Sequence, residues 1–132
     1  MKLFPFLKAS QWLSVLRIAL SLFMIAHGAI RIYAGTVNDF GGFLNDKGFV
    51  IGGIIAWGIT FFEIIGGILL ILNRFKKTIC LVFIIQLLVG ILLVHATNGW
   101  FVVGYSSGGM EYSVLLILGF LLTASNEESS IN

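Results

Sequence analysis

Long apolar runs, separated by short polar segments, form the main pattern of this chain. They predict four helices, at about residues 12–34, 50–72, 77–96 and 109–124. A helix needs about 20 apolar residues to cross the hydrocarbon core of a bilayer, so the fourth run is near the lower limit. Lipid offers no hydrogen-bond partners to the backbone, which favours helices over irregular structure. The pattern therefore predicts an all-α, polytopic membrane protein, a bundle of four transmembrane helices.

The segments between the runs indicate where the helices begin and end. Ser10 is the expected N-cap of the first helix. Residues 36–49 are the longest polar stretch and predict a loop or a short helix that lies on the membrane surface. The apolar residues of this stretch are Phe40, Phe43 and Leu44. Residues 97–109 form a glycine-rich connection, and residues 125–132 form a polar tail.

Composition agrees with a single membrane domain that spans residues 1–132. The chain is 58% hydrophobic and 11% charged, whereas about a quarter of the residues of a soluble domain are charged. Its scattered net charge of +2 argues against nucleic acid as a partner. Cys80 is the only cysteine, which excludes an intramolecular disulfide, and we expect it to be inert packing. The first run carries Arg17 and lacks a small-residue cleavage site, so it is interpreted as a retained helix.

Four crossings would place both termini on one side of the membrane. Lysines and arginines gather on that side, in the N-terminal segment and in the second connection: Lys2, Lys8, Arg74, Lys76 and Lys77. The first and third connections hold only Lys47. Because basic residues are enriched in cytoplasmic loops, the N- and C-termini are predicted to be cytoplasmic.

The first helix carries three ionisable residues within its apolar run. Arg17, His27 and Arg31 lie within about 80° of one another on a helix. A charge that faces lipid costs at least about 2.5–3.5 kcal/mol, so intramembrane charges usually face protein or a water-filled cavity. Arg17, near the inner end, is expected to reach the lipid headgroups. His27 and Arg31 are expected to face partners on the other helices.

Glu63 is the expected partner of Arg31. On the second helix Glu63 shares a face with small residues, which permit close packing between helices: Gly52, Ala56, Thr60 and Gly67. The first two helices run in opposite directions, and side chains lean toward the N-terminus of their own helix. Arg31 and Glu63 therefore lean toward each other, and an ion pair is predicted.

Further polar residues lie at the same predicted depth. Glu111 and Tyr112 open the fourth helix, and His95 ends the third. Gln86 lies on nearly the opposite face from His95, so both can face inward only if the helix has ended or is kinked by His95. The candidate ligand-binding residues are His27, Arg31, Glu63, His95, Glu111 and Tyr112.

Two interpretations of this polar cluster stay open at the level of the sequence. Arg31 and Glu63 form either a structural ion pair or a site for an oxyanion or carbonyl group, with Glu63 able to pass a proton. His27 makes either an interhelical hydrogen bond or a contact to a quinone carbonyl. No metal site is predicted, because the chain has no HExxH motif and no Cys/His spacing.

The order of these motifs resembles the DoxX family of small four-helix bacterial membrane proteins. An HGxxR motif (His27, Gly28 and Arg31) precedes a glutamate followed by glycines (Glu63, Gly66 and Gly67), a late histidine (His95) and a GGxEY motif (Gly108, Gly109, Glu111 and Tyr112). The resemblance covers residues 13–124. It implies a location in the bacterial cytoplasmic membrane.

The resemblance also implies a link to redox chemistry, because the family is related to the DoxD subunit of a thiosulfate:quinone oxidoreductase. We therefore expect a subunit of a membrane oxidoreductase system that binds a quinone or a small sulfur-containing anion. The sequence has no heme, flavin or iron–sulfur motif, so an oxidoreductase partner subunit is expected, and whether the chain is itself catalytic stays open. The alternatives are a noncatalytic scaffold or assembly factor and, third, a small transporter or channel, which would require a homo-oligomer.

Overall fold

The computed structural model describes residues 3–127. Within this range the chain forms helices and no strand, which confirms the all-α prediction. The five α-helices are α1 (Ala9–Tyr33), α2 (Val37–Asp46), α3 (Gly52–Ile71), α4 (Lys76–Gly90) and α5 (Glu111–Ser125). After α4 the chain continues as a π-helix over Ile91–His95 and a short 3-10 helix over Ala96–Asn98.

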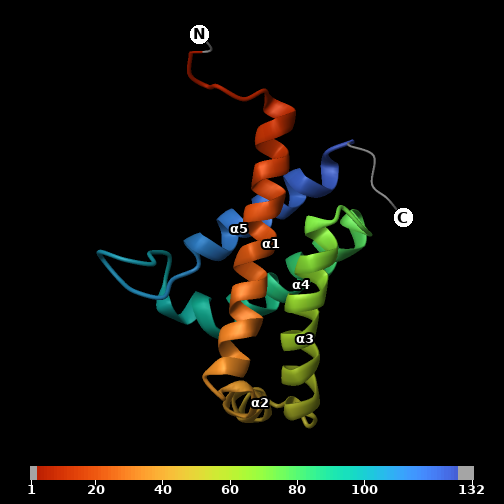
Figure 1. The fold of residues 1–132 in the computed structure, drawn as a ribbon. Helices are drawn as coiled ribbons and strands as arrows, with labels where there is room; N and C mark the ends of the chain where they lie inside the picture. The colour runs from red at the N-terminus through yellow and green to blue at the C-terminus, as the bar shows by residue number, and fades with distance from the viewer. Residues whose placement is uncertain (1–2, 128–132) are drawn as a thin grey trace.

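The helices form two layers rather than one parallel bundle. Helices α1 and α3 run side by side in opposite directions, and α2 lies across one end of this pair (Figure 1). Helices α4 and α5 pack against each other and cross behind α1 and α3 (Figure 1). We call the end of the molecule that carries α2 the α2 end.

Three helical segments of the described chain are long and apolar enough to cross a membrane: Ala9–Tyr33, Gly52–Ile71 and Lys76–Asn98. Helix α5 has 15 residues, a length of about 22 Å against a hydrocarbon core of about 30 Å. The structure therefore supports a multi-pass membrane protein with three candidate spans, and the four-span bundle stays a prediction.

The start of α1 differs from the prediction that Ser10 is its N-cap. The helix begins at Ala9, and the cap position belongs to Lys8. The Lys8 backbone N–H donates to the Gln11 side-chain oxygen at 2.9 Å. The Gln11 side chain thus satisfies the backbone N–H of the cap residue itself, as the third helical residue does in a capping box.

The segment predicted as a loop or a short surface helix is a helix that packs on protein. A Cβ on Gly41 of α2 would lie 2.8 Å from the Gly53 Cα, so the two backbones are in close contact. The Asn45 side-chain oxygen accepts a hydrogen bond from the Gly52 backbone N–H at 2.8 Å. These contacts fix α2 against the first turn of α3.

The core lies where the two layers cross. It is built from apolar side chains of α1, α3, α4 and α5: Leu20, Met24, Leu70, Ile79, Cys80, Phe83, Leu116 and Phe120. The Phe83 ring lies 5.1 Å from the Phe62 ring and 5.2 Å from the Phe120 ring, measured between centroids. Cys80 is fully buried in this core, as its predicted packing role requires.

The Arg17 guanidinium bonds to the protein backbone, which differs from the expectation that it reaches the lipid headgroups. One terminal guanidinium nitrogen donates to the backbone carbonyls of Leu70 at 2.5 Å and Ile71 at 2.6 Å. These carbonyls lie in the last turn of α3, where the helix supplies no i+4 partner, and the Leu70 carbonyl also accepts from the Asn73 backbone N–H at 3.1 Å. Arg17 therefore caps the C-terminus of α3 from the neighbouring helix.

Replacing Arg17 by methionine is expected to lower the free energy of unfolding by about 1.5–3 kcal/mol, the range for hydrogen bonds to charged groups. Equilibrium unfolding by SDS in mixed micelles measures this change. Arg74→Met is the matched control, because Arg74 is exposed. Equal stabilities for the two variants would contradict the capping role.

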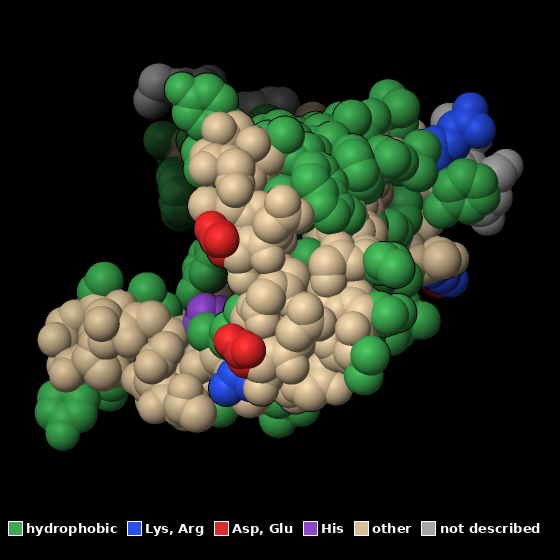
Figure 2. Space-filling model, turned by 90° about the horizontal axis from the view of Figure 1, so that it is seen from below, with side chains coloured by type: hydrophobic (Ala, Val, Ile, Leu, Met, Phe, Trp, Pro, Cys, Tyr) green, Lys and Arg blue, Asp and Glu red, His purple; other side chains and the backbone are tan. Residues whose placement is uncertain are grey.

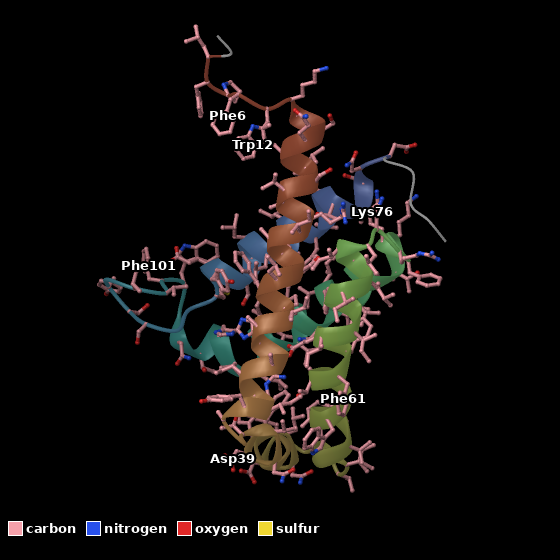
Figure 3. All side chains as sticks on the ribbon, viewed as in Figure 1. Phe6, Trp12, Asp39, Phe61, Lys76 and Phe101 are labelled. Carbon is pink, nitrogen blue, oxygen red and sulfur yellow. The ribbon has the colours of Figure 1, made fainter. Side chains whose placement is uncertain are left out.

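The beginning of α1 and the end of α5 lie toward the same end of the molecule, opposite the α2 end (Figure 1). Figure 3 shows Lys76 beside the end of α5 and Asp39 at the α2 end. The Lys76 ammonium group donates to the backbone carbonyl of Asn126. This contact ties the start of α4 to the end of α5.

Candidate functional site

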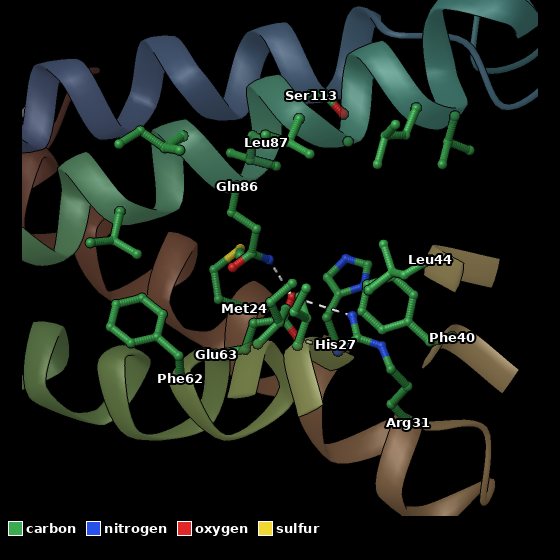
Figure 4. Close-up of a pocket in the computed structure, with 18 of the residues that line it drawn as sticks. Met24, His27, Arg31, Phe40, Leu44, Phe62, Glu63, Gln86, Leu87 and Ser113 are labelled. Carbon is green, nitrogen blue, oxygen red and sulfur yellow. Dashed lines mark hydrogen bonds and ion pairs between the residues drawn. The ribbon is translucent and has the colours of Figure 1, made fainter. Parts of the chain in front are cut away.

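A cavity of about 600 Å³ lies between the two layers, within the size range of small-molecule sites. Helices α1, α2 and α3 form one side, and α4, the π-helix and α5 form the other (Figure 4). Most of the lining is apolar. The polar lining residues are His27, Arg31, Glu63, Gln86, His95, Tyr112 and Ser113.

Glu63 is the centre of the polar cluster and is only 2% exposed. The Arg31 guanidinium donates to both carboxylate oxygens, at 2.7 Å and 3.3 Å. The Gln86 amide donates to the carboxylate at 2.6 Å from the opposite side (Figure 4). The predicted ion pair between Arg31 and Glu63 is confirmed, and α4 supplies a second donor.

Arg31 is held in place by two further contacts. Its guanidinium donates to the Thr60 hydroxyl at 3.0 Å, and this hydroxyl donates to the Ala56 carbonyl at 2.7 Å. The guanidinium also lies over the Phe40 ring, 4.9 Å from the centroid, a cation–π contact. Residues of α2 and α3 thus fix the position of a cation carried by α1.

Close packing of α1 and α3 makes this pairing possible. A Cβ on Gly28 would lie 2.7 Å from the Thr60 carbonyl oxygen, and one on Gly67 would lie 2.5 Å from the Ile25 side chain. The residues predicted to share the inward face of Glu63 are all buried: Gly52, Ala56, Thr60 and Gly67. Small residues therefore let the two helices approach, which brings Arg31 to Glu63.

The π-helix explains how Gln86 and His95 both line the cavity, although a continuous α-helix would place them on opposite faces. Its i→i+5 hydrogen bonds widen the turn, so each residue advances the chain by a smaller angle. His95 Nδ1 lies 2.8 Å from the Gly108 carbonyl oxygen. Because a carbonyl only accepts, Nδ1 carries the proton, and in the neutral ring Nε2 is an acceptor.

His27 and Tyr112 present exposed polar groups to the cavity. Within residues 3–127, no group forms a hydrogen bond with the His27 ring. The Tyr112 side chain is 41% exposed. Both side chains are therefore open to a ligand, whereas Arg31 and Glu63 are engaged with each other.

Glu111 is the one candidate that the structure places outside the cavity lining. Its carboxylate accepts a hydrogen bond from the Val102 backbone N–H at 2.9 Å. Its own backbone N–H donates to the Trp100 carbonyl at 3.0 Å. Glu111 thus organises the connection between α4 and α5 and is not brought together with the other five candidates.

Gln86 and residues of α2 belong to this site, although the sequence pattern does not predict them there. A single α-helical period puts Gln86 opposite His95, and the π-helix supplies the change of geometry that brings both residues to the cavity. The polar stretch around Phe40, Phe43 and Leu44 predicts a segment on the membrane surface, but these three residues line the cavity. An amphipathic helix shows which face is apolar and does not show whether lipid or protein covers that face.

Figure 2 looks onto the α2 end. Acidic side chains and a histidine are visible there, and the histidine lies in a hollow beside a projecting lobe. The connection between α4 and α5 projects to the left in Figure 1, the side on which the lobe lies in Figure 2. Arg31 of the polar cluster lies in the last turn of α1, against Phe40 of α2, and is thus near the α2 end.

Comparison with known proteins agrees with the resemblance drawn from the motifs. The model of the DoxX family matches residues 12–96. This range contains His27, Arg31, Glu63 and His95 and ends before α5 with its Glu111 and Tyr112. None of the curated proteins and none of the solved structures gives a significant match. The chain belongs to the DoxX family.

Proposed function

We propose that this protein binds a quinone in the cavity between its two layers, as the membrane subunit of an oxidoreductase system. The observation that carries the proposal is the combination of an apolar cavity of about 600 Å³ with polar side chains on several helices. A quinone has the matching chemistry, because its ring and tail are apolar and its carbonyl oxygens accept hydrogen bonds. Quinones exchange electrons and protons with redox proteins, and a partner subunit would supply or receive the electrons.

The donors that suit a quinone carbonyl are the His27 ring and the Tyr112 hydroxyl. Both line the cavity and are exposed to it. The His27 ring has no hydrogen-bond partner within residues 3–127, so a ligand would not have to break an existing bond. Glu63 also lines the cavity, on the α1–α3 side with His27, and its carboxylate can hold a proton.

A quinone fits better than a small sulfur-containing anion. An anion would compete with the Glu63 carboxylate for Arg31, which Glu63 binds through both oxygens. It would also lose its hydration in a cavity with mostly apolar walls, at a high cost in free energy. A flat neutral ring meets neither obstacle.

The proposal places the protein in the bacterial cytoplasmic membrane with both chain termini in the cytoplasm. The beginning of α1 and the end of α5 share one end of the molecule, and the basic residues near them support the orientation. The cavity then lies in the outer half of the membrane. Its partner subunit would approach from the polar α2 end or from the connection between α4 and α5.

A scaffold is the second candidate, and one observation favours it. Both oxygens of Glu63 are already hydrogen-bonded, to Arg31 and to Gln86, as in a polar cluster that only holds helices together. Such a cluster would need no ligand. The two candidates differ in whether the cavity binds a quinone.

Quinone binding to the purified protein in nanodiscs tests the proposal. We expect His27→Leu to weaken binding about threefold to tenfold, because it removes one hydrogen bond to the ligand. The fold should be unchanged, since His27 is exposed and has no hydrogen-bond partner in the described chain. Ala29→Leu is the matched control, an exposed position of α1 outside the cavity lining. If the wild type bound no quinone, the proposal would be rejected and the scaffold would be the remaining candidate function.

A further inference from the structure

The cavity reaches the surface of the protein along α3 and α4. Four cavity-lining residues of these helices are also exposed: Gly58, Val82, Ile85 and Val89. The exposed fractions of the three α4 side chains are 38%, 52% and 41%. None of the four carries a polar side chain. The rim on this side is therefore apolar, whereas the exposed polar lining residues, His27 and Tyr112, belong to α1 and α5.

Contacts on either side limit this opening. Toward the chain termini, the Phe62 ring of α3 packs against the Phe83 ring of α4, with 5.1 Å between centroids. Toward the α2 end, Leu93 of the π-helix packs against the buried cluster of Val37, Leu44 and Ala56. We call the opening between these contacts the α3–α4 window.

Both helices that frame the α3–α4 window are candidate membrane spans, so in a membrane the apolar rim of the window would face hydrocarbon. An apolar opening of this kind admits a ligand dissolved in the bilayer and excludes a hydrated one, because polar groups lose their hydrogen bonds to water on the way. It also leaves room for a chain that extends from the cavity into lipid.

Two glycines keep the cavity wall open. A Cβ added to Gly58 of α3 or to Gly90 of α4 would meet nothing within 4 Å. Elsewhere on α3, at Gly52 and Gly67, a Cβ would lie 2.3 Å and 2.5 Å from neighbouring atoms, so those glycines serve helix packing. Packing against protein does not account for Gly58 or Gly90, and both line the cavity.

We propose that the ligand is a quinone with a long isoprenoid tail, which enters from the hydrocarbon through the α3–α4 window and leaves its tail there. This inference rests on the proposed quinone function and adds the ligand class and the route. The ring lies beside His27 and Glu63, and the tail passes Gly58 and Val89 on its way into the lipid. Gly58 is the residue that determines whether a tail fits.

The test compares a tailed quinone with a tailless benzoquinone that has the same ring, both titrated into the protein in nanodiscs. Binding of each to empty nanodiscs is subtracted. The wild type is expected to bind the tailed compound at least about tenfold more tightly, because the tail adds van der Waals contacts with the walls of the window. Gly58→Phe is expected to remove most of this advantage and to leave the tailless compound within about twofold of its wild-type affinity.

Gly53→Phe is the matched control. Gly53 lies on the same helix, a Cβ there also meets nothing within 4 Å, and it does not line the cavity. This variant is expected to bind both compounds as the wild type does.

The outcomes separate the two proposals. Equal affinities of the wild type for the tailed and tailless compounds, or an unchanged tail advantage in Gly58→Phe, would overturn the window and leave quinone binding intact. If Gly58→Phe bound neither compound, the window would also be overturned, because blocking the path of the tail should leave binding of the tailless compound unchanged. Binding of neither compound by the wild type would overturn the proposed function itself.

Discussion

Replacing Arg31 by methionine is expected to lower the free energy of unfolding by about 3–5 kcal/mol, the cost of leaving a buried charge without its partner. Glu63 is 2% exposed and receives two hydrogen bonds from Arg31. In the variant only the Gln86 amide would still donate to the carboxylate. Equilibrium unfolding by SDS in mixed micelles measures the loss.

The double variant Arg31→Met with Glu63→Gln is the control for this experiment. It removes both charges and keeps a side chain that can hydrogen-bond Gln86. Because replacement of a whole buried ion pair is often nearly neutral, at least half of the lost stability should return. A double variant no more stable than Arg31→Met would show that the carboxylate charge is not the source of the cost.

Replacing Gly28 by leucine is expected to lower the free energy of unfolding by about 3 kcal/mol, at the upper end of the range for overpacked cores. The added Cβ would lie 2.7 Å from the Thr60 carbonyl oxygen and 2.8 Å from the Ile64 side chain. Helix α1 would have to move away from α3 beside the ion pair. The same unfolding assay measures the effect.

Gly53→Leu is the matched glycine for this comparison, because a Cβ there meets nothing within 4 Å. It removes the same backbone freedom without a clash. The free energies of unfolding of Gly28→Leu and Gly53→Leu should therefore differ by nearly the whole expected loss of about 3 kcal/mol. Similar stabilities would mean that the α1–α3 contact tolerates a side chain.

The contact between α1 and α3 could be predicted from the sequence because it follows from local geometry. The helical period places small residues on the face of Glu63, and the direction of the Cβ atoms makes Arg31 and Glu63 lean toward each other. Both helices are regular over these segments, so the assumption of 3.6 residues per turn holds. The ion pair follows from these rules without knowledge of the rest of the fold.

The layer formed by α4 and α5 could not be predicted in the same way. A hydrophobic pattern indicates which face of a helix is apolar and gives no crossing angle between helices that are far apart in the chain. Glu111 shows a second limit. An acid in the first turn of a helix can have several roles, so the sequence does not identify the partner of Glu111. That partner is the Val102 backbone N–H, which lies in the irregular connection between α4 and α5.

The π-helix at Ile91–His95 affects how this chain should be aligned with its relatives. Relative to an α-helix, this segment contains one surplus residue, and π-bulges of this kind are frequent at functional sites. A relative that is α-helical throughout would present the position counted as His95 to a different face. An alignment with such a relative should therefore place a gap of one residue within 91–95, so that structurally equivalent side chains are compared. Without the gap, each position between this segment and α5 would be compared with a neighbour of its true equivalent.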